Sequence, residues 1–382
     1  MKKNKKILIL VNDLSFFISH RLPIAEAALA KGFDVVIGYG ELGGADSKLL
    51  EQKGFKVKFI PTQRGGINPL EDLKTFFYIW KFFKKEKPDI AHLVTIKLYL
   101  YGGIISRLTG VPGLVSAVSG LGTVFISKNL KYRFLRLLAY PIYKLAFNHF
   151  NQKVIVQNKD DLKVLVKWGI LNPLKAKLLK GSGVKLENFT NLDEPDGTPT
   201  VCFAARLLRE KGVYEFVSAA RLLRERGIQA RFCLAGGLDT KNPTGLNLDD
   251  FNKLKEEVCV EVLGYHKDIP TLYASSHIIC LPSYREGLPK SLIEAAAASR
   301  AVVTTDVPGC RDAIIPNKTG LLVPVKDPQK LADALQWLIE HPQERIAMGI
   351  AGRKLAEKEF LIEKIVQNHL DIYQDLLVNN SV

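Results

Sequence analysis

Short runs of apolar residues recur along the whole chain, separated by turn residues and by segments in which apolar positions return at helical spacing. In the first half these runs are residues 7–11, 34–38, 57–60, 88–94 and 154–156. In the second half they are residues 201–204, 231–235, 261–263, 278–281, 301–304 and 320–323. Runs that are apolar at nearly every position are typical of parallel strands buried on both faces. The alternation of strand and helix therefore predicts an α/β chain with two doubly wound domains in series.

The length of the chain also favours two domains. A single hydrophobic core stops growing at roughly 250–300 residues, and this chain has 382. A polar stretch rich in Asp, Pro, Gly and Thr, residues 188–199, has the composition of a connection between domains. We therefore predict a first domain at 1–190, a second domain at 191–360 and a C-terminal helix at 361–382.

The net charge of +15 is carried by the first half of the chain. Residues 1–190 contain 31 Lys and Arg against 13 Asp and Glu, a formal charge of +18, and the remainder contains 23 against 26, a charge of −3. An anionic partner is therefore expected to meet the first domain. Nucleic acid is one such partner, but the sequence contains no recognised nucleic-acid-binding motif, and we predict no nucleic acid.

The spacing of the cysteines and the lengths of the apolar runs indicate the cellular compartment in which the protein works. The five cysteines lie far apart without CxxC spacing, which predicts free thiols in a reducing cytoplasm. The apolar run 7–11 is too short for the core of a signal peptide. The longest uncharged stretch, 108–127, contains Pro112 and four glycines, so we interpret it as strand and loop instead of a membrane span.

A segment rich in basic and aromatic residues lies at 128–150. Apolar residues recur there at helical spacing, and Lys128, Lys131, Arg133 and Arg136 gather at its beginning. A basic, aromatic, amphipathic helix can lie in the interface of a membrane. An ordinary packed helix with a solvated basic face would show the same pattern, and the sequence leaves both interpretations open.

Two glutamates eight positions apart mark a strand-to-helix junction in the second half. The apolar run 277–281 precedes Glu286, and an alanine-rich run follows Glu294. Glu286 is therefore expected in the turn, where backbone N–H groups are free to meet an anion, and Glu294 inside the helix. Such a junction suits a charged ligand rich in hydroxyl groups. A capped surface helix with two solvated acids gives the same local pattern.

A pair of cations follows the first strand of the second half. Arg206 comes just after the run 201–204, and Lys211 precedes the next helix. Arg forks onto phosphate oxygens and Lys supplies a point charge, so the two could neutralise a diphosphate close to Glu286. An R-x4-K pair alone is a weak signal, because cations are common on protein surfaces.

Together these motifs resemble the retaining GT-B glycosyltransferases of family 4 over nearly the whole chain. The resemblance is carried by the turn at 205–212, of the form G/A-R-L-x-x-x-K-G, by the E-x7-E motif at 286–294, and by the stretches 307–312 and 319–324. It implies two Rossmann-like domains that face each other across a cleft. The first would bind the acceptor and the second the nucleotide-sugar, and the C-terminal helix would return to the first.

The resemblance also implies roles for single residues. In the family, the matching Arg and Lys bind the donor's diphosphate, the first Glu and the loop after it contact the sugar, and the second Glu holds the ribose hydroxyls. Carried over, the catalytic residues would be Glu286, Arg206 and Lys211. The donor-binding residues would be Arg206, Lys211, Gly287, Leu288 and Glu294.

The resemblance narrows to bacterial enzymes that extend lipid-linked sugars for surface polysaccharides and glycans. It rests on the pattern from Asn12 to Pro23, on 119–122, on 181–184 and on the loop 287–291. It implies transfer from a nucleotide diphosphate-sugar, such as a UDP-N-acetylhexosamine, to an undecaprenyl-diphosphate-linked saccharide. The protein would then work as a peripheral protein at the cytoplasmic face of an anionic cell membrane.

Such transfer needs a polarised leaving diphosphate more than a strong base. Because the sequence has no D-x-D motif, we predict chemistry without metal or other cofactor, in which Arg206 and Lys211 take the place of a divalent ion. His20 and His92 are candidates near the acceptor, although a lone histidine is more often structural. The chain departs from many relatives at Ser119, where they have His, and at 15–17, where they have a glycine pair.

Two other functions fit the same sequence. A sugar-nucleotide epimerase can share the two-domain architecture, and it would release free nucleotide with an isomerised or eliminated sugar. A soluble glycosyltransferase would use a free sugar or polymer as its acceptor instead of a lipid-linked saccharide.

Overall fold

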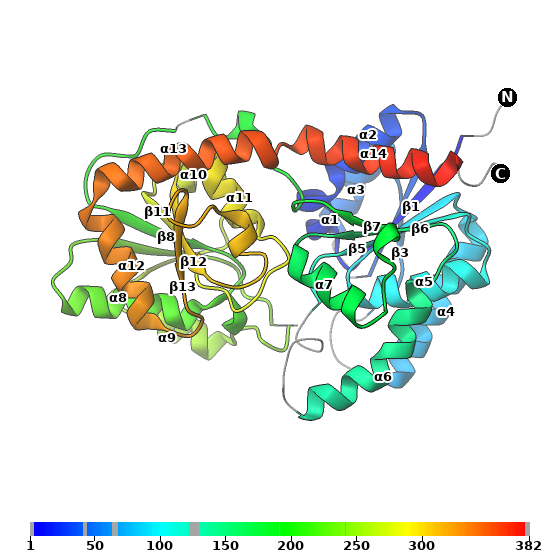
Figure 1. Ribbon diagram of the computed structural model, residues 1–382, viewed down its shortest axis with the longest axis horizontal. Coiled ribbons are helices and arrows are strands. Elements are labelled where there is room, and N and C mark those ends of the chain that lie inside the picture. Colours follow the sequence, from blue (N-terminus) through cyan, green and yellow to red (C-terminus); the bar gives the residue numbers. More distant parts are fainter. Residues whose placement is uncertain are drawn as a thin grey trace. The chain divides into compact units, whose positions relative to one another are not determined.

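A computed structural model describes residues 4–40, 44–62, 68–121, 130–190, 192–240 and 242–378. Among the predicted features, Gly122, Lys128 and the side chain of Lys131 lie outside the described residues. The chain divides into two compact units (Figure 1). Unit 1 consists of Met1–Ser182 and Glu363–Val382, and unit 2 consists of Gly183–Ile362. The first division therefore follows Ser182, before the predicted position 190, and the C-terminal segment belongs to unit 1.

Unit 1 is built on a parallel sheet whose described strands follow the order β3-β2-β1-β4-β5-β6-β7. The chain winds outward from β1 to β3 and then returns to β4 on the other side of β1, so the sheet is doubly wound, as the apolar pattern predicts. The strands are β1 (Lys6–Val11), β2 (Asp34–Tyr39), β3 (Lys56–Phe59), β4 (Ile90–Val94), β5 (Gly113–Val118), β6 (Gln152–Val156) and β7 (Ala176–Leu178).

Helices cover both faces of this sheet and bury its central strands, whereas the edge strands β3 and β7 are partly exposed. Residues Ile7 to Val11 of β1 are inaccessible to solvent, which explains why apolar residues occupy successive positions there. One face packs on α1 (Leu14–His20), α2 (Leu22–Ala30), α3 (Gly44–Gln52) and α14 (Ile362–Val378). The other face packs on α4 (Pro69–Glu86), α5 (Ile96–Leu108), α6 (Leu130–Ala146) and α7 (Lys159–Lys167).

Short polar side chains determine where several of these helices begin. Asp13 accepts a hydrogen bond from the backbone N–H of Phe16 at the start of α1, and Asn158 accepts one from Asp161 at the start of α7. Asn68 caps α4 in the same way, with Pro69 as the first helical residue. Side-chain oxygens at these positions satisfy N–H groups that have no partner inside the helix.

The amphipathic segment predicted at 128–150 forms α6, but its apolar residues do not all face the core. Tyr143 and Ala146 are buried against unit 1, whereas most of the large apolar side chains point outward. The packed-helix interpretation therefore holds for the inner face of α6 alone. Within the described residues, no helix has the length and apolar character needed to cross a membrane.

A cluster of buried polar side chains joins α14 to the sheet of unit 1. His92 of β4 is inaccessible to solvent, and its Nδ1 lies 2.6 Å from the Tyr373 hydroxyl of α14. The Nδ1 of His369, one turn earlier on α14, bonds the Ile365 carbonyl oxygen at 2.7 Å. Burial lowers the pKa of His369 to about 3 and that of His92 well below its usual value, and the nearby Arg21 guanidinium adds to both shifts. The ring of His92 is packed inside the unit, which favours a structural role, and its role toward an acceptor stays a prediction.

We expect unit 1 to lose stability as the pH falls from about 8 to about 5. In the unfolded chain a histidine takes up a proton near pH 6.5, whereas His92 and His369 stay neutral in the folded unit until much lower pH. Each neutral buried histidine therefore makes its full contribution to the free energy of unfolding above pH 6.5. Below pH 6.5 this contribution falls, by about 2 kcal/mol per histidine at pH 5. Urea unfolding followed by the fluorescence of Trp80 and Trp168, both in unit 1, measures the loss.

The His369→Gln variant is the matched comparison for this pH series. It lacks one of the three imidazoles that are buried in unit 1, the others being those of His92 and His149, so its free energy of unfolding should fall by about 2 kcal/mol less than that of the wild type between pH 8 and pH 5. A wild-type value that stays constant over this range would contradict the expectation.

Unit 2 is built on a second doubly wound parallel sheet, with its described strands in the order β10-β9-β8-β11-β12-β13. Figure 1 shows α8 and α12 on one side of this sheet and α11 and α13 on the other. The strands are β8 (Thr200–Ala204), β9 (Arg231–Ala235), β10 (Glu261–Gly264), β11 (Ile278–Leu281), β12 (Ala301–Thr305) and β13 (Gly320–Val323). The helices are α8 (Val213–Glu225), α9 (Leu248–Glu256), α10 (Ile269–Ala274), α11 (Lys290–Ala297), α12 (Pro328–Glu340) and α13 (Pro342–Glu359). All five cysteines lie in this unit as free thiols, as their spacing predicts.

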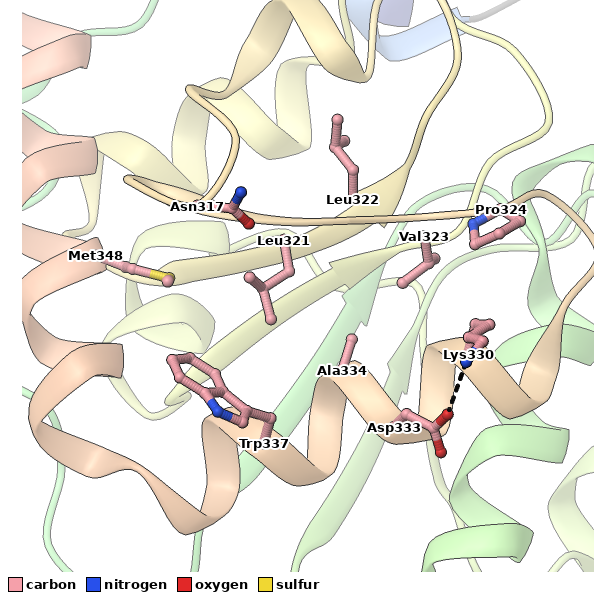
Figure 2. A pocket seen from close by; sticks show the side chains of 10 residues that line it. All are labelled: Asn317, Leu321, Leu322, Val323, Pro324, Lys330, Asp333, Ala334, Trp337 and Met348. Carbon is pink, nitrogen blue, oxygen red and sulfur yellow. Dashed lines mark ion pairs between the residues drawn. The ribbon is translucent and has the colours of Figure 1, made fainter.

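A cavity of about 540 Å³ lies in unit 2 between the edge strand β13 and α12. Figure 2 shows Leu321 and Val323 pointing from the strand toward the helix, with Trp337 at one end and the Lys330–Asp333 ion pair at the other. Most of its lining is apolar, and it contains none of the residues to which the motifs assign a role.

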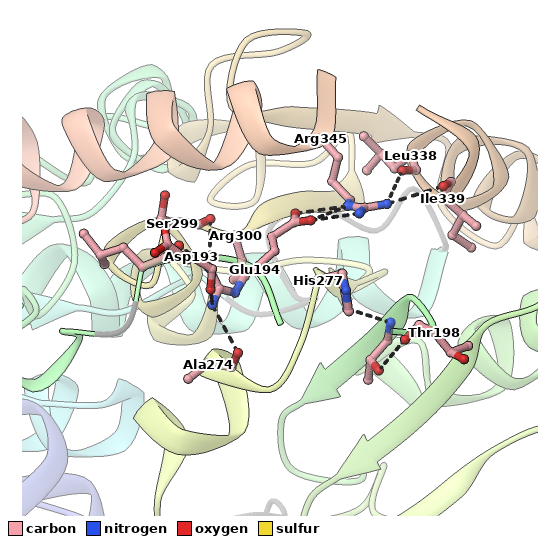
Figure 3. Close-up of polar contacts among 12 residues, drawn as sticks. Asp193, Glu194, Thr198, Ala274, His277, Ser299, Arg300, Leu338, Ile339 and Arg345 are labelled. Carbon is pink, nitrogen blue, oxygen red and sulfur yellow. Dashed lines mark hydrogen bonds and ion pairs between the residues drawn. The ribbon is translucent and has the colours of Figure 1, made fainter. Parts of the chain in front are cut away.

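The polar stretch at 188–199, predicted to connect the domains, is instead packed onto unit 2 (Figure 3). The Arg300 side chain is fully buried and donates hydrogen bonds to the carbonyl oxygens of Leu192 and Asp193, both at 2.7 Å. Arg345 forms a forked ion pair with Glu194, with Nη2 to Oε2 at 2.8 Å. The polar composition of this stretch suggested a linker. In the structure, its backbone carbonyl and carboxylate groups accept hydrogen bonds from two buried arginines, which hold the stretch on unit 2.

Candidate active site

The predicted site residues lie in unit 2, at the carboxyl ends of neighbouring strands. Arg206 and Lys211 follow β8, and Glu286 follows β11, which pairs with β8 in the sheet. The strand order reverses at this pair, because β9 and β10 lie on one side of β8 and β11 to β13 on the other. Doubly wound sheets bind their ligands at such a switch point, where the loops diverge to the two faces.

A glycine brings the turn after β8 against the turn after β11. Gly212 has a φ of +79°, and a Cβ atom built on it would lie 2.2 Å from the carbonyl oxygen of Pro282. A side chain at this position would therefore push the two turns apart. Gly212 ends the short 3-10 helix Arg209–Lys211, so the close approach places Lys211 beside the loop that carries Glu286.

Lys211 and Glu286 form an ion pair between Nζ and Oε1. Their side chains are 18% and 11% exposed, so the pair is largely shielded from water, which strengthens its electrostatic interaction. The Ser283 hydroxyl lies 2.8 Å from the same Glu286 oxygen and 3.0 Å from the Glu210 carbonyl oxygen, so its single proton can be shared between these two acceptors. Ser283 thus ties the two turns together. The sequence analysis missed it, because a serine after a strand carries no distinctive signal.

Arg206 lies next to a carboxylate from a third strand end. Its Nη1 is 2.5 Å from Oδ2 of Asp239, which follows β9. The approach depends on Gly236, because a Cβ atom there would lie 2.0 Å from the Ala205 carbonyl oxygen. The Arg206 side chain is 47% exposed, so the guanidinium is oriented while it remains accessible. Asp239 was also missed, although two glycines and an acid just after an apolar run could have indicated it.

The stretch 307–312 supports the loop after Glu286. Gly309 has a φ of +82°, and a Cβ atom there would lie 2.5 Å and 2.6 Å from the carbonyl oxygens of Glu286 and Gly287. The Glu286 N–H also donates to the Pro308 carbonyl oxygen at 3.3 Å. The Leu288 side chain is 7% exposed and packs in the core of unit 2. Leu288 can therefore meet a ligand through its backbone, while its side chain anchors the loop.

Glu294 lies inside α11, as predicted, and its side chain is 15% exposed. Its Oε1 lies 3.3 Å from the Nζ of Lys290, one turn earlier. Burial raises the pKa of the Glu294 carboxyl, and the Lys290 ammonium partly opposes this shift. Pro289 precedes α11 and makes no capping side-chain hydrogen bond, so the first turn of the helix presents backbone N–H groups to an anion.

The arrangement as a whole suits a ligand with both negative charges and hydroxyl groups. Arg206 and Lys211 come from the turn after β8 and Lys290 comes from the start of α11, and each of these three cations is paired with a carboxylate. A diphosphate could accept hydrogen bonds from such cations, and the carboxylates could accept hydrogen bonds from sugar hydroxyls. Within the described residues, no three His, Cys, Asp or Glu side chains come together as a metal site.

His20, the other histidine predicted near an acceptor, lies at the end of α1 in unit 1. Its ring stacks on Phe16 with the centroids 4.3 Å apart, and its Nδ1 lies 2.6 Å from the Ser19 hydroxyl. Unlike His92, it is partly exposed. Its role toward an acceptor stays a prediction.

Two family models cover most of the chain between them. Residues 6–158 match the model described as "Glycosyl transferase 4-like", and residues 184–355 match "Glycosyl transferases group 1". The first match falls within unit 1 and the second within unit 2.

Similar proteins are named as transferases of sugars to lipid-linked saccharides. An N,N'-diacetylbacillosaminyl-diphospho-undecaprenol alpha-1,3-N-acetylgalactosaminyltransferase of Campylobacter jejuni is 30% identical over 86% of this chain and 88% of its own length. A UDP-Gal:alpha-D-GlcNAc-diphosphoundecaprenol alpha-1,3-galactosyltransferase of Escherichia coli is 26% identical over 84% of each chain.

A solved structure shows the same fold. The Anabaena protein HepE, crystallised with UDP and glucose, superposes with a TM-score of 0.75 over 97% of this chain and all of its own, at 19% sequence identity. At this identity the likeness concerns the fold. The relative that is 30% identical over most of both chains, the two family models and the two doubly wound sheets together show that the chain belongs to the GT-B glycosyltransferases of family 4.

Proposed function

We propose that this glycosyltransferase moves a sugar, with retention of its anomeric configuration, from a UDP-sugar to an undecaprenyl-diphosphate-linked saccharide during the synthesis of a surface polysaccharide or glycan. The donor we favour is a UDP-N-acetylhexosamine. The observation that carries the proposal is the junction of Lys211, Glu286 and Ser283 at the switch point of unit 2. The names of the Campylobacter and Escherichia relatives support the lipid-linked acceptor, and the second supports a UDP-sugar.

The donor's diphosphate would bind to Arg206 and Lys211. Both side chains are already oriented by carboxylates, so little conformational entropy is lost when the diphosphate binds. In the transition state the leaving diphosphate gains negative charge, and fixed cations stabilise that charge without rearrangement. The N–H groups at the start of α11 add to this stabilisation.

The carboxylates and the loop between them would hold the sugar and the ribose. Glu286 and the backbone of Gly287 and Leu288 would contact the transferred sugar, and Glu294 would accept hydrogen bonds from the ribose hydroxyls. Because Glu294 is largely buried, a missing hydroxyl would leave its carboxylate without compensation, which favours ligands that carry both hydroxyls. In this assignment unit 2 binds the donor, unit 1 binds the acceptor, and no metal takes part.

We also propose that the protein works at the cytoplasmic face of the cell membrane as a peripheral protein. An acceptor linked to undecaprenyl diphosphate is held in the bilayer, so an enzyme that uses it must approach the membrane surface. Unit 1, residues 1–182 and 363–382, contains 31 Lys and Arg against 15 Asp and Glu, and this formal charge of +16 would attract it to anionic lipid headgroups.

Transfer to a lipid-linked acceptor tests this function directly. Incubated with a UDP-N-acetylhexosamine and a polyprenyl-diphosphate-linked saccharide, the protein should form an α-linked product, and EDTA should leave the rate unchanged. NMR of the anomeric proton measures the configuration, and chromatography separates the products.

The possible contrary results point to different alternatives. A β-linked product would contradict retention, and loss of activity in EDTA with recovery in magnesium would contradict metal-free chemistry. Free nucleotide with an isomerised or eliminated sugar would identify an epimerase. Transfer to a free sugar but not to the lipid-linked one would identify a transferase with a soluble acceptor.

A further inference from the structure

We propose that α6 and the first half of α4 form an insertion surface that enters the bilayer between the headgroups and the acyl chains. This inference rests on the proposed membrane location and goes beyond it, because it assigns the attachment to apolar side chains in addition to charge. It also names the helices of unit 1 that make the contact.

The outward face of α6 is strongly apolar. Leu130, Phe134, Leu137, Leu138, Ile142 and Leu145 are between 39% and 76% exposed. They recur at intervals of three and four residues and therefore form one stripe along the helix. A folded domain rarely leaves so many large apolar side chains on one stripe in water, and such a patch marks an interaction site.

The polar residues of α6 indicate which partner covers this stripe. The sequence of α6 contains no Asp or Glu, and its cations include Arg133, Arg136 and Lys144. Arg133 and Lys144 are exposed, and the Arg136 guanidinium lies 5.5 Å from the centre of the Trp168 ring. An apolar stripe with cations on its flanks fits the headgroup region of an anionic bilayer, where aromatic side chains also partition.

Helix α4 carries a second apolar surface. Leu70, Leu73 and Phe77 in its first half, and Tyr78 just after its midpoint, are between 43% and 72% exposed. Lys81, Lys84 and Lys85 are exposed toward its end. Both α4 and α6 pack against α5, so the two belong to one helical layer of unit 1. The first half also carries Glu71, Asp72 and Lys74, but Glu71 pairs with Lys74 and Asp72 pairs with Lys97, so these charges are compensated. The apolar side chains of α4 can therefore reach the boundary between headgroups and acyl chains while the lysines near its end stay among the headgroups.

A second copy of this chain is a less suitable partner. In a contact between two α6 helices, arginines and lysines of one copy would meet those of the other, because α6 offers no carboxylates to pair with them. Like charges brought together in an interface oppose association. An anionic lipid surface supplies the missing negative charge.

The apolar and electrostatic contributions to membrane binding can be distinguished by how each responds to salt. Salt screens the attraction between exposed charges, whereas the burial of apolar surface does not depend on that attraction. We therefore expect wild-type protein to float with anionic vesicles of phosphatidylglycerol and phosphatidylcholine at about 0.1 M NaCl. A substantial fraction should remain bound at about 1 M NaCl, when the Debye length is about 3 Å.

Two double variants separate the contributions. Phe134→Ser with Leu138→Ser should reduce the partition coefficient about tenfold or more at both salt concentrations, and Leu73→Ser with Phe77→Ser should reduce it severalfold. The matched control is Leu174→Ser with Val258→Ser, which removes two side chains that are 84% and 81% exposed but lie outside α4 and α6. This control should float as wild type does.

The proposal is overturned if wild-type protein does not float, if it is released completely at the high salt concentration, or if the Phe134→Ser, Leu138→Ser variant floats as wild type does. It is also overturned if light scattering without lipid shows a wild-type dimer and a variant monomer with unchanged flotation, because the stripe would then be an interface between copies. Flotation uses no sugar substrate, so its failure is distinct from a failure of the proposed transferase activity. Because the substitutions on α4 and α6 lie in unit 1, urea unfolding followed by the fluorescence of Trp80 and Trp168 checks that this unit is folded in each variant.

Discussion

Replacing Lys211 by alanine should lower kcat/KM for the UDP-sugar donor about 100- to 1000-fold. This corresponds to about 3–4 kcal/mol of lost transition-state stabilisation. The Lys211 ammonium is shielded from water and sits at the switch point of unit 2, where the leaving diphosphate would develop negative charge. The variant also loses the ion pair with Glu286, which then depends on Ser283 for its orientation. Initial rates with a UDP-sugar and a polyprenyl-diphosphate-linked acceptor measure the effect.

Two further variants show whether the loss comes from this position. Lys330→Ala removes the same charge from α12 of unit 2, where the lysine is 63% exposed, and it should leave kcat/KM nearly unchanged. Lys211→Arg keeps the charge but presents a planar fork in place of a point charge, so it should recover only part of the activity. A Lys211→Ala enzyme within about threefold of wild type would remove Lys211 from the site.

Replacing Arg300 by methionine should lower the free energy of unfolding of unit 2 by about 3–5 kcal/mol. Arg300 is fully buried and donates to the carbonyl oxygens of Leu192, Asp193, Tyr273 and Ala274 at 2.7 to 3.2 Å (Figure 3). Methionine fills much of the space but donates no hydrogen bond. Each buried carbonyl left without a donor costs about 1–3 kcal/mol before the segment relaxes.

Urea unfolding followed by the fluorescence of Trp337 measures this loss, since Trp337 is the tryptophan of unit 2. Arg226→Met is the matched control. Arg226 lies at the surface of the same unit and pairs with Asp333 at 2.8 Å, and a pair of this kind contributes at most about 1 kcal/mol. Equal losses for the two variants would show that the contacts of Arg300 do not stabilise unit 2 as we infer.

Much of the architecture could be read from the sequence, because strand and helix formation depend on local patterns. The apolar runs at 201–204 and 278–281 became β8 and β11, since a strand buried on both faces needs apolar residues at successive positions. The strand-to-helix junction at 286–294 was also local, and Glu294 lies in α11 as predicted. The order and spacing of the motifs were sufficient to indicate the family.

The partners of the site residues could not be read in the same way. Asp239 lies 33 positions from Arg206, and Ser283 lies 72 positions from Lys211 on a different strand end. Such pairs meet because β9 and β11 flank β8 in the sheet, and the order of strands depends on long-range packing. Gly212 and Gly309 lie in motifs that the sequence shows, but the reason that each must be glycine is not readable there, since it comes from carbonyl groups more than 20 residues away.

Burial is the other property that only the tertiary structure decided. His92 reads in the sequence as a histidine at the end of a strand, and it became a core residue because α14 covers it with Tyr373. The apolar stripe of α6 is the opposite case, since the sequence left open whether it packs in the core or faces a membrane, and most of it is exposed. Periodicity states which side chains share a face of a helix. What that face meets depends on elements distant in the chain, and in α6 the arrangement left the apolar face open to a partner outside the protein.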